Sequence, residues 1–582
     1  MDEQQRKLAE ELLFSSAGKS GFAKKLFLGA FQADNIFPFP KVSEDERIKT
    51  EKLLKRVEAF ADANINADAI DREASIPDNV IQGLAELGVL GMTIPTEYGG
   101  LGMSQYAYCQ VTEAISRRCG STALFINAHQ SIGLKALLLF GTEAQKQKWL
   151  APLAQGKFIA AFSLTEPTAG SDANGIQTRA VYDPEKKIWR LTGKKQWTTN
   201  GAFADVLTVM ARTEVDTPQG KQDKITAFLI TPSMPGFKVT AAALEKVGMR
   251  GSKTANLEFN DVDVPEENIL GPLGGGLKVC LTVLDFGRTT FGATCAGAAK
   301  FLVEKAISHA KSRYQFNRPL SSFGLVKYKL ATMSALLYAI QATTYMTAGL
   351  IDNHVEDFML ESAMLKVFSS DSLWSILYDT MQIYGGHSFF TDHPFERMMR
   401  DARLNMIGEG SNEVMRVFIG AVGMRDAGLK LQATLESVMH PIAQFSLLQK
   451  STIHWLSRLK IPVVPLKSPL LKEEGLVLGQ KVRSFGLAVA KLLIKYKEDI
   501  IERQLQLDRI ATSAMALYTA SATLSYLDSD MQSNSKDFKD DIATAKLYCA
   551  LAFKTIDRQL ASISDNCDDT IENLSDQLTG AK

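Results

Sequence analysis

Cysteine is scarce and irregularly placed in this sequence. Its six cysteines include no Cys-x-x-Cys pair, which argues against both a structural zinc site and a disulfide framework. The seven histidines show no His-Glu-x-x-His spacing, so no metal site is expected. The cysteines are therefore predicted to be reduced thiols of a reducing compartment.

Neither an excess of one charge nor a long apolar run is present. The chain has 65 Lys and Arg against 65 Asp and Glu, and this balance does not predict a nucleic-acid partner. No uninterrupted apolar run reaches the roughly 18 residues of a membrane span. The acidic start of the chain predicts neither a secretory signal nor an Arg-rich transit peptide. We expect a cytoplasmic bacterial protein, with peripheral contact to the inner membrane left open. A mitochondrial location would require that a transit peptide has been removed.

The chain of 582 residues is too long for a single hydrophobic core. A helical pattern gives way near residue 158 to short β-branched and aromatic segments, which predict about seven strands. Helical periodicity then returns in long stretches at 277–311, 324–351 and 358–384. The predicted fold is mainly α with a central β-barrel domain. The expected domains are an N-terminal helical domain (1–157), the β domain (158–272), a helix bundle (273–427) and a C-terminal helical extension (428–582).

Two segments at predicted strand ends are rich in groups that suit a planar ring. The first, Phe-Ser-Leu-Thr-Glu-Pro-Thr-Ala-Gly-Ser-Asp at 162–172, leads from a strand into a turn dense in hydroxyls and backbone donors. The second, Trp-Thr-Thr-Asn-Gly at 197–201, sets an aromatic plane beside hydroxyls. Taken singly, an ordinary turn and a core tryptophan explain these segments as well as a ligand does.

Two later segments supply a cation and a carboxylate. Arg-Tyr-Gln-Phe-Asn-Arg-Pro at 313–319 offers Arg313 for a pyrophosphate, although a single arginine at a helix end is more often simply solvated. Within 400–416, Glu409 stands between two glycines, which let the backbone approach a ligand closely. Ser411 or Asn412 is expected to cap the helix that follows. The alternative for Glu409 is an exposed loop carboxylate.

Taken in this order, the four segments resemble the acyl-CoA dehydrogenase family, and the similarity extends over almost the whole chain. The C-terminal extension, the stretches at 22–29 and 37–40, and Phe323 followed by Gly324 resemble the very-long-chain subgroup and its complex I assembly-factor relative. The resemblance implies FAD bound between the β domain and the helical domain of a homodimer.

The resemblance also implies roles for individual residues. Thr165 would bond the pyrimidine side of the flavin, Trp197 would pack near the ring, and Thr199 would reach N5. Arg313 and its neighbours would hold the adenine dinucleotide of the neighbouring subunit, with 382–386 contributing from the other side. The implied cofactor-binding residues are Phe162, Leu164, Thr165, Ser171, Trp197, Thr198, Thr199, Arg313, Gln315, Phe316, Gln382, Gly385, Gly386, Ser411 and Asn412. The implied substrate-binding residues are Ser171, Asp285, Arg288 and Gly410.

The implied reaction is the α,β-dehydrogenation of a long-chain or very-long-chain acyl-CoA to the trans-2-enoyl-CoA. Glu409 would take the α-proton, the β-hydride would pass to the flavin, and an electron-transfer flavoprotein would receive the electrons. Some family members carry the base on an earlier helix, at the position of Gly287 here, so Glu409 is the candidate that remains. Gly408 replaces the usual aromatic residue before the base, and Ser411 replaces the usual threonine.

Two other functions use the same resemblance. An acyl-CoA oxidase would return the electrons to oxygen, and peroxide formation would distinguish it. A respiratory-complex assembly or scaffold protein would use the fold without catalysis. Separately, residues 430–475 combine apolar and basic side chains that suit a membrane surface, with packing onto the chain's own helices as the alternative.

Overall fold

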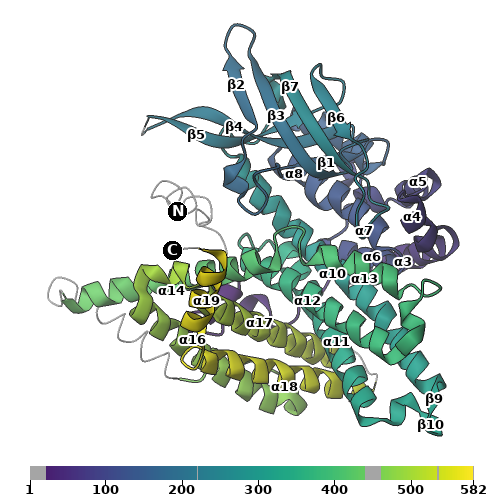
Figure 1. Ribbon diagram of the computed structural model, residues 1–582, viewed down its shortest axis with the longest axis vertical. Coiled ribbons are helices and arrows are strands. Elements are labelled where there is room, and N and C mark those ends of the chain that lie inside the picture. The colour runs from purple at the N-terminus through teal and green to yellow at the C-terminus, as the bar shows by residue number, and fades with distance from the viewer. Residues whose placement is uncertain (1–20, 219, 440–459, 534–536, 581–582) are drawn as a thin grey trace. The chain divides into compact units, whose positions relative to one another are not determined.

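The computed structural model describes residues 21–218, 220–439, 460–533 and 537–580, and it confirms the predicted fold class (Figure 1). The chain forms two compact units. The first contains Lys41–Met333 and Ser369–Ser411, and the second contains Gly18–Pro40, Ser334–Phe368 and Asn412–Lys582. The N-terminal stretch Gly18–Pro40 therefore belongs with the C-terminal helices, not with the N-terminal helices that follow it.

The first unit begins with a series of helices, several of which are capped by a polar side chain. Residues 44–73 form two helices and not one, because Asn66 accepts a hydrogen bond from Ala69 N at 3.0 Å and starts a second helix. Leu53, Val57 and Ala61 form the buried face of the helix before this break. These helices are α3 (Glu44–Asn64), α4 (Ala67–Glu73), α5 (Asp78–Glu86), α6 (Gln105–Ser116), α7 (Gly120–Ile126), α8 (Lys135–Phe140) and α9 (Glu143–Ala154).

A π-helical segment, Asn127–Leu134, joins α7 to α8 and makes one continuous helix from Gly120 to Phe140. This is the one helix among the described residues that is long and apolar enough to cross a membrane. Its most apolar window is 78% buried within the protein, as is usual for a core helix. All eight residues of the π-helical segment are buried.

The β domain is a curled sheet of eight strands, against the seven or so expected from the sequence. Its order is β6-β7-β3-β2-β4-β5-β8, and β1 pairs in parallel with β4. The short strand β8 has only two residues, too few to give a pattern in the sequence. The strands are β1 (Ala160–Ser163), β2 (Arg179–Asp183), β3 (Ile188–Thr199), β4 (Val206–Thr217), β5 (Gly220–Ile230), β6 (Phe237–Ala241), β7 (Thr254–Pro265) and β8 (Ile269–Leu270).

The three long helices predicted after the β domain are confirmed to within one residue at each end. They are α10 (Gly276–Ser312), α11 (Gly324–Asp352) and α12 (Met359–Tyr384), and α13 (Phe395–Asn405) follows. Between α10 and α11 the chain forms a hairpin from β9 (Tyr314–Gln315) and β10 (Arg318–Pro319). Phe316 and Asn317 at its tip both have positive φ, as a two-residue turn of this type requires.

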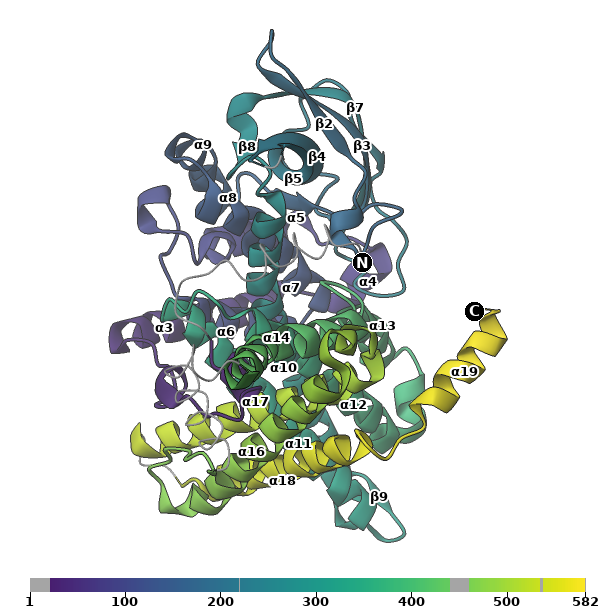
Figure 2. The same ribbon diagram turned by 90° about the vertical axis from the view of Figure 1, so that its left-hand side faces the viewer.

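The second unit is a helical assembly in which α16, α17 and α18 lie side by side (Figure 2). Its helices are α2 (Ala23–Leu26), α14 (Asn412–Met439), α16 (Lys472–Tyr496), α17 (Gln504–Ser533), α18 (Lys539–Ser562) and α19 (Asp568–Thr579), with parts of α11 and α12. Phe22 and Phe27 of the N-terminal stretch are buried in it, and Glu361 accepts a hydrogen bond from Ala23 N at 2.7 Å. Burial raises the pKa of Glu361 to about 7. Of the segment 430–475, for which membrane contact was predicted, residues 440–459 lie outside the described residues.

Candidate active site

Glu409 stands on a short loop between α13 and α14 in an unusual backbone conformation. Its φ is +57°, in the left-handed region that disfavours any residue except glycine. Gly410 follows at φ +96°. A side chain held in this region costs free energy, so the neighbouring contacts must hold the loop. The Glu409 side chain is half-buried.

Three groups fix Glu409 against α10 and the π-helical segment. Arg288 Nε donates to the carbonyl oxygen of Glu409 at 3.2 Å, and Arg288 is itself paired with Asp285 at 3.0 Å. Asn127 Nδ2 donates to Oε1 of Glu409 at 3.1 Å. Gly287 leaves room for the carboxylate, because a Cβ atom there would lie 2.9 Å from Oε2.

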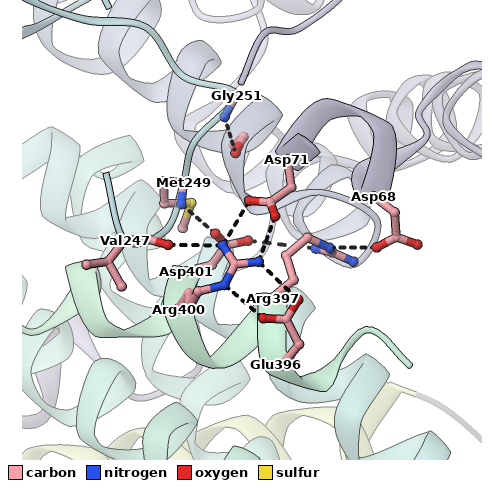
Figure 3. A network of polar contacts seen from close by, with 10 residues as sticks. Asp68, Asp71, Val247, Met249, Gly251, Glu396, Arg397, Arg400 and Asp401 are labelled. Carbon is pink, nitrogen blue, oxygen red and sulfur yellow. Dashed lines mark hydrogen bonds and ion pairs between the residues drawn. The ribbon is translucent and has the colours of Figure 1, made fainter. Parts of the chain in front are cut away.

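An ionic network holds α13, the helix that leads into the Glu409 loop (Figure 3). Arg400 donates two hydrogen bonds to Asp71, at 3.0 and 2.6 Å, and two to Glu396, at 2.9 and 3.1 Å. These hydrogen bonds raise the pKa of Arg400 further above its usual range. A third contact runs from Arg400 Nη1 to the carbonyl oxygen of Val247 at 3.0 Å, in the loop between β6 and β7. The network thus ties α13 to α4 and to the β domain.

Arg397 and Asp401 add a second layer to the same network. Arg397 Nε donates to Asp68 at 2.9 Å and lies 3.7 Å from Asp401. Asp401 accepts a hydrogen bond from the backbone N–H of Met249. The sequence did not predict this network, because most of its contacts join segments that lie far apart in the chain.

A buried ion pair stabilises the turn after β1. Lys195 Nζ lies 2.7 Å from Glu166 Oε1, and the two side chains are almost fully buried. Burial by itself would raise the pKa of Glu166, but the charge and hydrogen bond of Lys195, together with the hydrogen bonds from Thr178 and Gln177, lower it. Gln196 N donates to the carbonyl oxygen of Thr165 at 2.9 Å, which brings the two predicted segments of the β domain together.

The predicted flavin-contacting side chains of the β domain point in different directions. Trp197 is 63% exposed, with φ +59°, so it is not the core tryptophan that the sequence left open. Thr199 is half-exposed at the end of β3, whereas the Thr198 hydroxyl is buried and lies 2.8 Å from Ser163 Oγ. The hydroxyl of Thr198 therefore bonds within the protein, and its role in cofactor binding stays a prediction.

Phe162, Leu164 and Ser171 complete this group of predicted residues. Phe162 and Leu164 are half-buried and pack against the core beneath the turn. Ser171 is exposed, and among the described residues nothing lies within 4 Å of the Cβ position of the neighbouring Gly170. The turn therefore presents an open, hydroxyl-bearing surface.

A separate groove gathers the predicted residues at the far end of α10. It has a volume of about 440 Å³ and is lined by residues that include Arg313, Gln315, Gly385 and Gly386. Its floor includes His309, whose ring stacks on Tyr384 with centroids 4.0 Å apart. No described atom lies within 4 Å of the Cβ positions of the two glycines, so the backbone is open to a ligand. Gln382 and Phe316, also predicted to bind the cofactor, are both exposed and lie close in the sequence to residues that line the groove. Phe316 is 87% exposed.

Asp285, Arg288 and Asn412 are buried, and their side chains bond to other groups of the protein. Asp285 and Arg288 are 8% and 5% exposed and bond to each other, and Arg288 holds the Glu409 loop. These contacts make the pair a support for the loop more than a surface for CoA. The side chain of Asn412 is buried and accepts a hydrogen bond from Lys366 at 2.7 Å. Ser411 and Gly410 remain half-exposed beside Glu409.

The arrangement fits a flavin dinucleotide. An exposed indole and a hydroxyl stand at one strand end, and a guanidinium stands beside a glycine-lined groove, which are the partners of a ring and of a pyrophosphate. Asn127 and Gly287, which the sequence did not mark as functional, complete the surroundings of Glu409. Since the partner of Asn127 lies 282 residues away, no local pattern could have revealed it.

Family models match most of the chain from residue 49 onward. The sequence matches the acyl-CoA dehydrogenase N-terminal domain at 49–157, middle domain at 161–262 and C-terminal domain at 274–424. Residues 469–580 match the ACAD9/ACADV C-terminal domain.

Two known proteins illustrate the similarity. The mitochondrial very long-chain specific acyl-CoA dehydrogenase of Bos taurus is 38% identical over 520 residues, which cover 88% of this chain and 79% of the relative. An acyl-CoA dehydrogenase from Bacillus anthracis, solved in complex with FAD, has a TM-score of 0.80 at 27% identity and covers 97% of this chain and 96% of its own.

The chain therefore belongs to the acyl-CoA dehydrogenase family. It is a flavin-dependent oxidoreductase that uses FAD and acts on acyl-CoA thioesters.

Proposed function

We propose that this protein desaturates long-chain and very-long-chain acyl-CoA thioesters between Cα and Cβ, with Glu409 as the base. The observation that carries this proposal is the half-buried carboxylate of Glu409, fixed on a left-handed loop between Arg288 and Asn127. A carboxylate in a water-poor pocket becomes a stronger base when a bound substrate excludes the remaining water.

The protein's own groups act on the thioester end of the substrate. The proposed donor to the thioester oxygen is the backbone N–H of Glu409, which stabilises the negative charge that develops there, and the carboxylate takes the α-proton. Arg288 keeps the loop in place through the Glu409 carbonyl oxygen while the proton moves. Bound FAD supplies the acceptor for the β-hydride. The product is the trans-2-enoyl-CoA.

The preference for long chains is supported by the relatives and by the C-terminal extension. The bovine relative is described as very long-chain specific, and 469–580 matches the extension domain of the same subgroup. An electron-transfer flavoprotein is the proposed electron acceptor, because members of the family pass their electrons to such a partner.

A homodimer is proposed because the two groups of cofactor residues lie far apart in one chain. Arg288, beside Glu409, and Ser312, beside Arg313, are 24 residues apart on α10, which separates them by about 36 Å along the helix axis. One flavin dinucleotide does not span that distance and also reach the β-domain turn. The Arg313 groove therefore serves the cofactor of a second subunit.

Anaerobic addition of palmitoyl-CoA to the purified flavoprotein tests the proposal. The flavin absorbance should bleach in the wild type and trans-2-enoyl-CoA should form. Glu409→Gln should slow bleaching by at least about a hundredfold, because a positioned base contributes that much or more. Bleaching that survives Glu409→Gln would exclude this residue as the base. Stoichiometric peroxide on admission of air would instead favour an oxidase, and a flavin-free protein that forms no enoyl product would favour a scaffold.

A further inference from the structure

The π-helical segment Asn127–Leu134 interrupts an otherwise regular helix next to Glu409. In a π-helix the backbone hydrogen bonds run between residues five apart and not four. Such segments are rare, and many of those known lie at functional sites. All of its residues are buried. Its polar side chains must therefore find partners within the protein, and those partners show what each side chain does.

Three of the polar side chains bond only to the scaffold. His129 accepts a hydrogen bond from Ala160 N at 3.0 Å, and its other ring nitrogen lies 3.2 Å from the carbonyl oxygen of Leu153. Gln130 accepts from Thr93 N at 3.4 Å. Ser131 Oγ lies within 3.1 Å of the hydroxyls of Tyr108 and Thr290.

Asn127 differs from these neighbours. It is 1% exposed, and its amide donates to Oε1 of Glu409 at 3.1 Å. Within the described part of the chain, its own Oδ1 is buried without a hydrogen-bond partner. Gln130 also leaves one amide atom buried without a partner among the described residues, so what distinguishes Asn127 is its acceptor, the Glu409 carboxylate. The single side-chain hydrogen bond thus points to Glu409 as the reason for an amide at this position.

We propose that Asn127 is a positioning residue that holds the carboxylate of Glu409 in one direction and favours its charged form before the substrate binds. This inference rests on the proposed role of Glu409 as the base. A hydrogen bond to an ionised carboxylate is stronger than one between neutral groups, and it disappears as a charged bond once the carboxylate takes a proton. Gly287 complements Asn127, because it leaves the other carboxylate oxygen room against α10.

The inference has a measurable consequence in the pH dependence of catalysis. Without the amide donor, the charged form of Glu409 loses a stabilising contact, so the protein must be brought to higher pH before the base is ionised. In Asn127→Ala the acid limb of kcat/KM for palmitoyl-CoA should move up by about one pH unit. At pH 6 the variant should therefore be about tenfold slower than the wild type, with the difference narrowing near pH 8.

Two further variants test whether the shift of the acid limb comes from the contact between Asn127 and Glu409. Asn127→Asp places a second carboxylate beside Glu409, and like charges disfavour joint ionisation, so its acid limb should move further than that of Asn127→Ala. Ser131→Ala is the matched control, because Ser131 lies in the same π-helical segment and bonds away from Glu409. It should lower the thermal midpoint without moving the acid limb. An unmoved limb in Asn127→Ala, or an equal shift in Ser131→Ala, would overturn the inference.

A double-mutant cycle separates this inference from the role of Glu409 as the base. At pH 8, Asn127→Ala should lower the thermal midpoint of unfolding more in the wild type than in Glu409→Gln, where the charged acceptor is gone. At a pH low enough to protonate Glu409 this coupling should vanish. Equal effects of Asn127→Ala in both backgrounds at pH 8 would contradict the hydrogen bond itself. If the coupling is present but Glu409→Gln still bleaches with substrate, the proposed base is wrong and the hydrogen bond stands.

Discussion

At the scale of single residues, two glycines near Glu409, Gly287 on α10 and Gly408 in the loop, differ in the space around them. A Cβ atom at Gly287 would meet Oε2 of Glu409 at 2.9 Å and Ile132 Cγ1 at 3.1 Å. At Gly408 the nearest atom to an added Cβ would be Leu404 O at 3.6 Å, an ordinary contact. A Cβ atom at Gly287 therefore displaces the end of the Glu409 side chain, whereas the position of Gly408 has room for a side chain.

Gly287→Ala should displace the carboxylate and slow flavin reduction by palmitoyl-CoA by about ten- to a hundredfold, because reacting groups tolerate little misplacement. Gly408→Ala is the matched control and should stay within about twofold of the wild type. The rate constants come from anaerobic stopped-flow absorbance. Equal losses in both variants would show that the clearance at Gly287 does not matter.

His129 carries a pH effect on stability. Burial lowers its pKa to about 4, while the unfolded chain has a pKa near 6.5. The unfolded state therefore takes up a proton first, so the stability that the neutral ring contributes is complete above pH 6.5 and is lost as the pH falls toward 4. Between pH 7.5 and pH 5 the wild type should lose about 2 kcal/mol of unfolding free energy from this group.

Substituting His129 by a group that does not titrate isolates that effect. Urea denaturation of His129→Gln should show a flatter dependence on pH, although the variant is less stable than the wild type at pH 7.5. His354→Asn is the control, because His354 is exposed and asparagine tolerates its φ of +56°. The same pH dependence in His129→Gln and wild type would rule out His129 as the source.

At the scale of elements, the Glu409 loop depends on how α13 is anchored. Arg400 holds Asp71 of α4 with two hydrogen bonds and also reaches Val247 before β7 (Figure 3). Lysine cannot reproduce this forked geometry. Arg400→Lys should lower the free energy of unfolding by about 2 kcal/mol or more and slow flavin reduction, because α13 leads directly to Glu409.

Arg403 provides the comparison, because it lies on the same helix and its side chain is exposed. Arg403→Lys should change both the thermal midpoint and the rate very little. If Arg400→Lys behaves like Arg403→Lys, the network does not anchor the loop.

The elements also show what the sequence could and could not predict. The long helices were predictable to within one residue because each has a continuous apolar period between clear breaks, as α10 does between the glycines before Gly276 and Arg313. Glu409 was identifiable because its segment, 400–416, is continuous in the chain and resembles that of the acyl-CoA dehydrogenase family. Asn127 was not, because helical periodicity does not distinguish a π-helical segment and the carboxylate it meets is distant in the chain.

At the scale of the whole molecule, the sequence did not predict which segments belong to which of the two units. The stretch Gly18–Pro40 lies in the unit of the C-terminal helices because its apolar side chains, Phe22 and Phe27 among them, are buried there. An apolar pattern shows that a segment is buried but not against what it packs. The separation of the Arg313 groove from Glu409 likewise follows only from the length of α10.

Mixed dimers test whether two subunits share each cofactor site. Arg313→Glu should remove cofactor binding and Glu409→Gln should remove the base, so each variant is inactive by itself. After the subunits are mixed and allowed to exchange, about a quarter of wild-type activity should return, because half of the dimers are mixed and each has one complete site. No recovery in demonstrably mixed dimers would place both groups in the site of one chain.

The central claim is that Glu409 removes the α-proton of an acyl-CoA, and deuterium exchange measures that step by itself. The holoenzyme is incubated in D2O with a 3-thia acyl-CoA, in which sulfur replaces the β-carbon and hydride transfer is blocked, and α-deuterium is followed by mass spectrometry. The wild type should exchange the α-protons, and Glu409→Gln should exchange them at least about a hundredfold more slowly. Exchange at the wild-type rate in a folded, flavin-loaded Glu409→Gln protein would contradict the account.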